Sequence, residues 1–159
     1  MMRIVISCLL IVNFLFAQVE SLLGKDYESL NITQEICPIK DVSIPKNKDW
    51  LGYIQYTNGD ITALSSPKYT FVLYIKETEV LKRDDIANLY LTDHKTGKLI
   101  DAKTAYYVFG SRIMSVGGDD IIPFAKESDA KEFLDNNGGK HIYRVDRMTA
   151  NFINYLDMR

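Results

Sequence analysis

The order strand, strand, capped helix, strand occurs twice in this sequence of 159 residues, and it constrains the fold more than any other feature. Residues 50–92 carry the first copy and residues 105–145 the second. Each helix is predicted to begin at a serine, Ser66 or Ser128, whose hydroxyl can accept a hydrogen bond from a backbone N–H of the first turn. We therefore predict an α+β fold of two ββαβ units, with antiparallel sheets and helices packed on one face.

The first copy opens with a predicted hairpin. Residues 50–56 and 61–64 alternate like half-buried strands, and Asn58-Gly59 between them favours a tight turn with positive φ at two positions. Pro67 suits the first position of the following helix, because its missing N–H is not needed there. The residues predicted to share one side of that helix are Tyr69, Val72, Leu73 and Lys76.

The second copy has predicted strands at residues 105–109, 121–125 and 141–145. Its helix is expected to end at residues 136–139, where glycine can adopt the left-handed conformation. A C-terminal helix beginning near Asp146 is predicted as well. The apolar residues that favour it, at helical spacing, are Met148, Phe152, Tyr155 and Leu156.

Residues 1–17 are predicted to be a secretory signal peptide. Arg3 precedes an apolar run at residues 4–16, and Ala17 supplies a small residue for cleavage. The run is too short for a membrane-spanning helix, which needs about 20 residues. Cleavage would leave a polar tether at residues 18–35, followed by one domain at residues 36–159.

Two cysteines offer few disulfide options. Cys8 lies in the predicted signal peptide, where the preceding residues loosely resemble a lipoprotein cleavage box; lipidation there would anchor the protein to the membrane. The alternative is a plain signal-peptide core. If Cys8 is removed, Cys37 is the only thiol, and in an oxidising compartment it could join two copies. Both a monomer and a dimer therefore stay open.

The charge balance argues against a nucleic-acid partner. Loss of Arg3 leaves 18 basic and 21 acidic residues, a net charge of −3, which suggests no basic face. Catalysis is not predicted either. The aspartates that could suggest an acid–base or hard-metal site have no histidine or nucleophile placed beside them; they are Asp93, Asp101, Asp119 and Asp120.

Residues 93–139 read DHKTGKLIDAKTAYYVFGSRIMSVGGDDIIPFAKESDAKEFLDNNGG. This order of turn, strand, glycine-rich loop, strand and helix resembles the second half of the NosL family of nitrous oxide reductase accessory proteins. The positions that match the family are Asp93, residues 96–98, residues 100–102, Ala105, Val108, Gly110, Ser111, residues 122–124, Ala130, Phe133 and residues 138–139. The resemblance implies two α+β units side by side in an exported copper-handling protein.

The family's sulfur ligands are only partly present. Related sequences have C-P-x-C-G-M before the first strand and G-P-M-G in the loop of the second half. Cys37 matches the opening cysteine, whereas Lys40 and Val42 stand at the second cysteine and the methionine. Gly117 stands at the methionine of the loop. Three sulfur donors of the family are therefore replaced.

Copper(I) prefers thiolate and thioether sulfur, with imidazole as an acceptable further ligand. We predict Cys37 and Met114 as ligands, because Met114 lies in the glycine-flanked loop three positions before Gly117. His94 or His141 could complete the site. The alternatives are a buried or intermolecularly bonded cysteine, a packing methionine and exposed, inert histidines; Met148 and Met158 are weaker candidates, and helical spacing explains Met148 as core.

The resemblance implies a periplasmic copper(I)-binding metallochaperone that presents copper to apo nitrous oxide reductase or to its assembly machinery. The alternative is a diverged family member that has lost the metal and serves as a periplasmic protein-interaction module. Organomercurial lyases are thought to have a related fold, but their chemistry needs a pair of thiols. The mature chain would have one.

Overall fold

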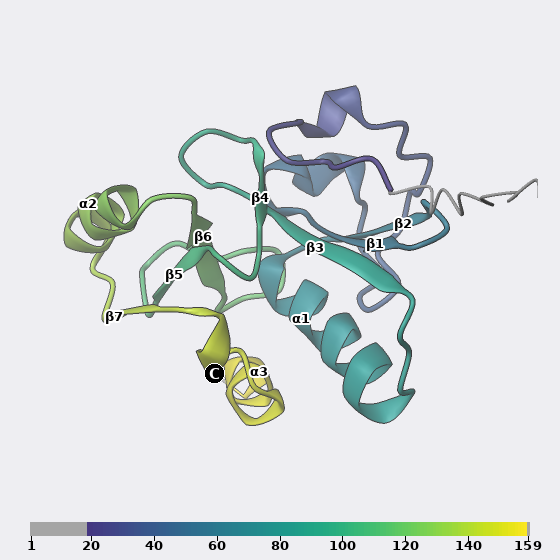
Figure 1. The fold of residues 1–159 in the computed structure, drawn as a ribbon. Helices are drawn as coiled ribbons and strands as arrows, with labels where there is room; N and C mark the ends of the chain where they lie inside the picture. Colours follow the sequence, from purple (N-terminus) through teal and green to yellow (C-terminus); the bar gives the residue numbers. More distant parts are fainter. Residues whose placement is uncertain (1–18, 159) are drawn as a thin grey trace, which may run out of the picture.

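The computed structural model describes residues 19–158 (Figure 1). The predicted signal peptide and Cys8 lie outside these residues. None of the helices within residues 19–158 is long and apolar enough to cross a membrane.

The first unit is a four-stranded antiparallel sheet with one helix. Its strands β1 (Gly52–Tyr56), β2 (Ile61–Leu64), β3 (Ile86–Thr92) and β4 (Leu99–Asp101) lie in the order β2-β1-β3-β4. Helix α1 (Pro67–Ile75) packs against β1 and β2. The predicted ββαβ order is confirmed, and β4 is an additional strand.

The second unit repeats this plan with a smaller antiparallel sheet. Its strands β5 (Tyr106–Phe109), β6 (Ile121–Phe124) and β7 (His141–Tyr143) lie in the order β6-β5-β7. Helix α2 (Glu127–Asn137) contacts all three strands. The second ββαβ unit is also confirmed.

The two units are joined through helices. Figure 1 shows α1 between the two sheets, beside the C-terminal helix α3 (Ala150–Asp157). Helix α1 contacts β6 of the second unit and α3 as well as its own sheet. The remaining helical turns are short: 3-10 turns at Tyr27–Ser29, Pro45–Trp50 and Val145–Arg147, and a π-helical turn at Lys76–Val80.

Two of the predicted ends of helices α1 and α2 are confirmed, and one is wrong. Ser66 caps α1 as expected, since its Oγ accepts a hydrogen bond from the Tyr69 N–H at 3.3 Å. The cap predicted at Ser128 is wrong: α2 begins at Glu127, and Lys126 at the cap position makes no side-chain hydrogen bond. Acidic residues in the first turn interact favourably with the helix dipole there. Gly138 ends α2 with a φ of 70°, as predicted.

The hairpin between β1 and β2 is present, but its turn differs from the prediction. Gly59 has a φ of 93°, and the one non-glycine residue with positive φ within residues 19–158 is Lys82. Asn58 therefore does not have the positive φ that a two-residue turn requires. The N–H of Gly59 donates to the carbonyl of Tyr56 at 2.9 Å, and the N–H of Tyr56 donates to Asp60. This is the pattern of a three-residue loop closed by a glycine bulge.

Two helices differ in part from their predictions. The first turns of α1 are buried on every side, including Lys68 and Phe71, because α1 lies between the two units. Lys76, predicted to share one side of this helix with Tyr69, is exposed, whereas Tyr69 is buried. Helix α3 begins at Ala150 instead of near Asp146. Of the residues whose spacing favoured it, Phe152 and Leu156 are buried and Tyr155 is exposed.

The segment predicted as a tether lies against the first unit over its described residues. Leu22 is buried in the core. The N–H of Gly24 donates to Leu99 in β4 at 2.9 Å, and Leu99 donates to Lys25 at 2.8 Å. Gln34 exchanges two hydrogen bonds with the backbone of Ala63. Residues 19–35 therefore pack against the first unit and form part of the folded domain.

Candidate functional site

Cys37 is a buried thiol at the start of a short loop before β1. Only 3% of the residue is exposed. Its backbone N–H donates to Val42 at 3.0 Å, which closes the loop on itself. Its Sγ accepts a hydrogen bond from the N–H of Ser65 at 3.5 Å. The thiol therefore lies against the junction where β2 leads into α1.

Tyr69 links the Cys37 region to the glycine-rich loop of the second unit. A Cβ at position 117 would lie 2.8 Å from Cε2 of Tyr69, so the ring fills the space beside Gly117. Burial raises the pKa of Tyr69; the cation of Lys68 opposes this shift, while the carboxylates of Asp157 and Asp120 act with burial. Cys37 reaches the same helix start through Ser65, the residue before the helix cap Ser66. Cys37 and Gly117, which the family resemblance places at two sulfur positions, therefore both lie near the start of α1.

A buried ammonium group lies beside the same loop. Lys68 is 1% exposed, and its Nζ donates to the carbonyl of Gly117 at 2.7 Å. The same nitrogen pairs with Oδ1 of Asp157 in α3 at 2.9 Å. The charge is therefore compensated, as buried charges must be. Lys68 holds α1, the glycine-rich loop and α3 together.

Asp120 fixes the other end of this loop to α1. Its Oδ1 accepts from the backbone N–H groups of Lys68 and Ile121, each at 2.8 Å, and its Oδ2 accepts from Oγ of Ser115 at 2.6 Å. Burial raises the pKa of Asp120, although these hydrogen bonds act in the opposite direction. The role of Asp120 is therefore structural: it satisfies an N–H at the start of α1.

Met114, the second predicted ligand, is far more exposed than Cys37. It lies in the same loop with 59% of its surface exposed. Within residues 19–158 no three side chains of His, Cys, Asp or Glu are grouped so that they could hold a metal ion. Met148 is buried in the core, and Met158 is exposed at the end of α3. The structure thus places Cys37 in the core beside Ser65, whereas Met114 is exposed on the loop.

The two histidines lie in aromatic surroundings. His94 is half-buried, with ring centroids 4.9 Å from Phe133, 5.7 Å from Phe124 and 5.7 Å from Trp50. The expectation that His94 is exposed is therefore wrong, since three rings that are distant in sequence enclose it. His141 is exposed and stacks on Tyr143 at 5.5 Å. The ring neighbours of both imidazoles are aromatic side chains.

His94 should make the stability of the protein depend on pH. Burial lowers the pKa of His94, while the charges of Asp93 and Asp49 oppose the shift. The folded state therefore binds a proton less readily than the unfolded state, whose histidine pKa is about 6.5. Neutral His94 therefore contributes fully to the stability of the folded state above about pH 6.5. This contribution is lost as the pH falls from the pKa of the unfolded state through the lower pKa of the folded state.

The substitution His94→Gln should remove this pH dependence. In urea unfolding at pH 7.5, 6.0 and 5.0, the free energy of unfolding of the unmodified protein should fall relative to that of the variant as the pH decreases. His141→Gln is the matched control and should keep the slope of the unmodified protein, because His141 is exposed. Parallel pH profiles for the unmodified protein and His94→Gln would contradict this prediction, because they would mean that His94 has the same pKa in the folded and unfolded states.

The family model of NosL matches residues 30–153, which is more than half of the chain. The crystal structure of the copper chaperone NosL from Shewanella denitrificans is similar in fold, with a TM-score of 0.59 and 18% sequence identity over 84% of this chain and 97% of that chain. A comparison with curated proteins found no match. The resemblance seen in residues 93–139 is confirmed, and this chain belongs to the NosL family.

Proposed function

We propose that this protein is an exported copper(I)-binding accessory protein that serves the maturation of the copper centres of nitrous oxide reductase. Membership of the NosL family and the likeness to a copper chaperone support this role. The observation that carries the proposal is that Cys37 and Gly117 both lie near the start of α1, Cys37 against Ser65 and Gly117 against Tyr69. The two positions at which the family resemblance implies sulfur ligands would thus lie at the same helix start, although only one of them still has a sulfur.

The ligand set of this chain suits transfer better than storage. Cys37 offers one soft thiolate, the kind of ligand that copper(I) prefers. Met114 offers a thioether, but one sulfur is buried and the other is exposed, so one side chain must move before both can bind the same ion. Copper held by few ligands can pass to a partner that supplies the missing ones. We propose that apo nitrous oxide reductase, or its assembly machinery, is that partner.

The proposed setting is the periplasm, reached through the predicted signal peptide, with membrane attachment only if Cys8 is lipidated. The proposed role is delivery of an ion by exchange of copper–ligand bonds, with no covalent bond of a substrate made or broken. It therefore requires no catalytic residue.

A competition titration against a copper(I) chelator tests the proposal. The mature protein should retain about one copper(I) per chain at micromolar chelator, and Cys37→Ser should abolish this retention because it removes the thiolate. Met114→Leu should weaken binding less than Cys37→Ser. Met158→Leu is the matched control, since this methionine is exposed at the end of α3, and it should leave retention unchanged. Retention that is the same in Cys37→Ser would remove the proposed site.

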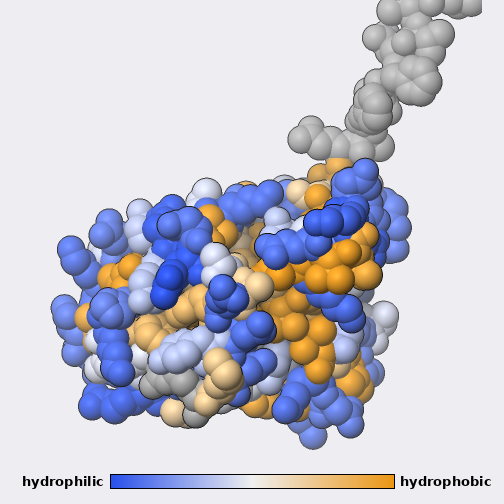
Figure 2. Space-filling model, turned by 90° about the horizontal axis from the view of Figure 1, so that it is seen from below, coloured by the Kyte–Doolittle hydropathy of each residue, from blue (hydrophilic) through white to orange (hydrophobic). Residues whose placement is uncertain are grey.

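A second candidate function is a periplasmic protein-interaction module without metal. Two observations favour it. The ring of Tyr69 fills the space beside Gly117, and the ammonium of Lys68 places a positive charge at this loop, where it would repel a copper ion. Figure 2 shows apolar side chains on one surface of the molecule, and large apolar side chains such as Val80 and Leu81 are exposed. Failure of the unmodified protein to retain copper at micromolar chelator would favour this second function.

A further inference from the structure

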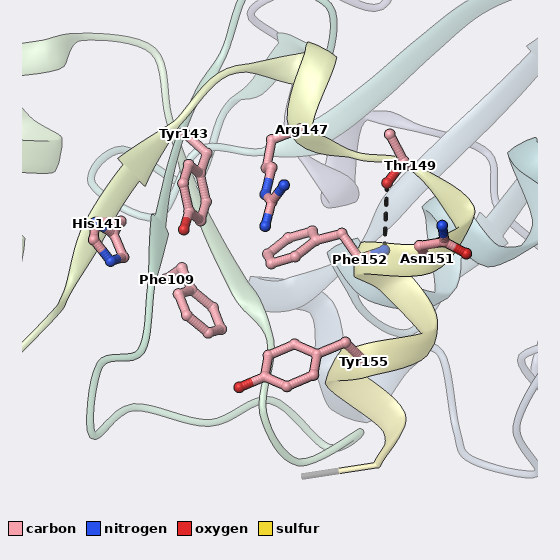
Figure 3. Close-up of a pocket in the computed structure, with 8 residues that line it drawn as sticks. All are labelled: Phe109, His141, Tyr143, Arg147, Thr149, Asn151, Phe152 and Tyr155. Carbon is pink, nitrogen blue, oxygen red and sulfur yellow. Dashed lines mark hydrogen bonds between the residues drawn. The ribbon is translucent and has the colours of Figure 1, made fainter.

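A separate cavity of about 470 Å³ lies between β5, β7 and the start of α3 (Figure 3). It shares no lining residue with the region of Cys37, Tyr69 and Gly117. Its size is within the range of small-molecule binding sites. What it binds can therefore be considered independently of copper.

Aromatic rings form the walls of this cavity. The centroid of Phe109 lies 5.9 Å from that of Tyr143 and 5.5 Å from that of Phe152, and Tyr143 and Phe152 are 5.5 Å apart. Tyr155 lies 6.3 Å from Phe109 on the α3 side. Figure 3 shows these rings turned toward one another from different elements. Such walls suit a flat apolar group, which can stack on them or meet their edges.

A guanidinium group supplies the charge of the cavity. Arg147 is exposed, and its Cζ lies 5.1 Å from the centroid of Phe152 and 5.4 Å from that of Tyr143. It makes no ion pair with a carboxylate of residues 19–158, and no acidic residue lines the cavity. The two rings hold the planar cation in place and leave its N–H groups available to an anion.

The start of α3 adds a second favourable feature for an anion. Thr149 and Asn151, which flank the first residue of this helix, both line the cavity. Oγ1 of Thr149 accepts from the N–H of Phe152 at 3.3 Å, as the dashed line in Figure 3 shows. The N-terminal end of a helix carries a partial positive charge. The partial positive charge at the start of α3 and the guanidinium of Arg147 therefore both favour an anion in this cavity.

We propose that this cavity binds a carboxylate attached to an aromatic ring or to a similar flat apolar group. The carboxylate accepts charge-assisted hydrogen bonds from Arg147, and the ring lies among Phe109, Tyr143 and Phe152. A free aromatic acid and the C-terminal aromatic residue of a polypeptide have this chemistry in common.

Amide NMR titration of residues 18–159 tests the proposal with four probes. These are 3-phenylpropionate, its neutral amide 3-phenylpropanamide, and an acetylated Gly-Gly-Gly-Phe peptide with a free or an amidated C-terminus. The two carboxylates should give saturating shifts at Tyr143, Arg147 and Asn151, and the two amides should not. Tighter binding of the free-acid peptide would identify a polypeptide C-terminus as the source, and binding of the small acid alone would identify a free metabolite.

Two arginine variants separate recognition from folding. Arg147→Gln should weaken carboxylate binding about ten- to a hundred-fold, as expected for the loss of hydrogen bonds to a charged group. Arg144→Gln is the control: Arg144 also stacks on a ring, that of Tyr106 at 3.9 Å, but it does not line the cavity. It should bind as the unmodified protein does. Equal binding of acids and amides, unchanged binding by Arg147→Gln, or the absence of saturable shifts would each overturn the proposal.

Discussion

Gly117→Met should destabilise the protein by about 1–3 kcal/mol, because its Cβ would overlap the buried ring of Tyr69. Tyr69→Ala should cost about 3–5 kcal/mol, since it removes a large buried side chain. The double variant should be less destabilised than the sum of the two changes, by about 0.5–3 kcal/mol, because the methionine enters the space that the ring leaves. Urea unfolding of the four proteins measures this coupling.

The same double variant should also bind copper(I) more tightly than the unmodified protein. It places a thioether at the methionine position of the family, beside the region of Cys37, and copper(I) favours sulfur. Tyr69→Ala alone is the matched control, because it opens the same space without adding a ligand. Strictly additive stabilities, or equal copper affinity in the double variant and Tyr69→Ala, would contradict the arrangement of Cys37, Tyr69 and Gly117 described above.

Lys68→Met should lower the free energy of unfolding by about 1–3 kcal/mol. The change keeps most of the side-chain volume but removes the ammonium, which leaves the Gly117 carbonyl without its hydrogen bond and Asp157 without its cation. Because Asp157 is half exposed, water can solvate it, so the cost should stay below that of a fully buried pair. Chemical denaturation at pH 7 measures the difference.

Lys95→Met is the matched control for Lys68→Met. Lys95 also forms an ion pair, with Glu132 at 2.9 Å, but both side chains are at least half exposed. Exposed pairs contribute about 0–1 kcal/mol, so this variant should unfold almost as the unmodified protein does. An equal decrease in the free energy of unfolding for both substitutions would mean that the buried Lys68 stabilises the protein no more than the exposed Lys95 does.

Structural features that depend on residues close to one another in the sequence could mostly be predicted. Ser66 and Gly138 mark helix ends through contacts within a few positions, and both predictions are confirmed. The turn after β1 was predicted with the wrong geometry, because Asn58-Gly59 is compatible with more than one hairpin loop. Ser128 was misplaced as a cap for a similar reason: several polar residues there could begin the helix.

The candidate site was less predictable, because long-range contacts form it. The family resemblance indicated Cys37 and Gly117, but no local pattern shows that both lie near the start of α1. Lys68 follows a proline in an ordinary helix start, and its burial depends on Gly117 and on Asp157, which belong to other elements. His94 is half-buried for the same reason, since its three ring neighbours come from separate parts of the chain.

Copper K-edge X-ray absorption of the copper(I)-loaded mature protein tests most directly whether Cys37 carries the metal. The spectrum of the unmodified protein should show sulfur bound to copper, and this sulfur contribution should fall or disappear in Cys37→Ser. A spectrum with nitrogen and oxygen ligands alone, or the same sulfur signal in both proteins, would contradict the role proposed for Cys37.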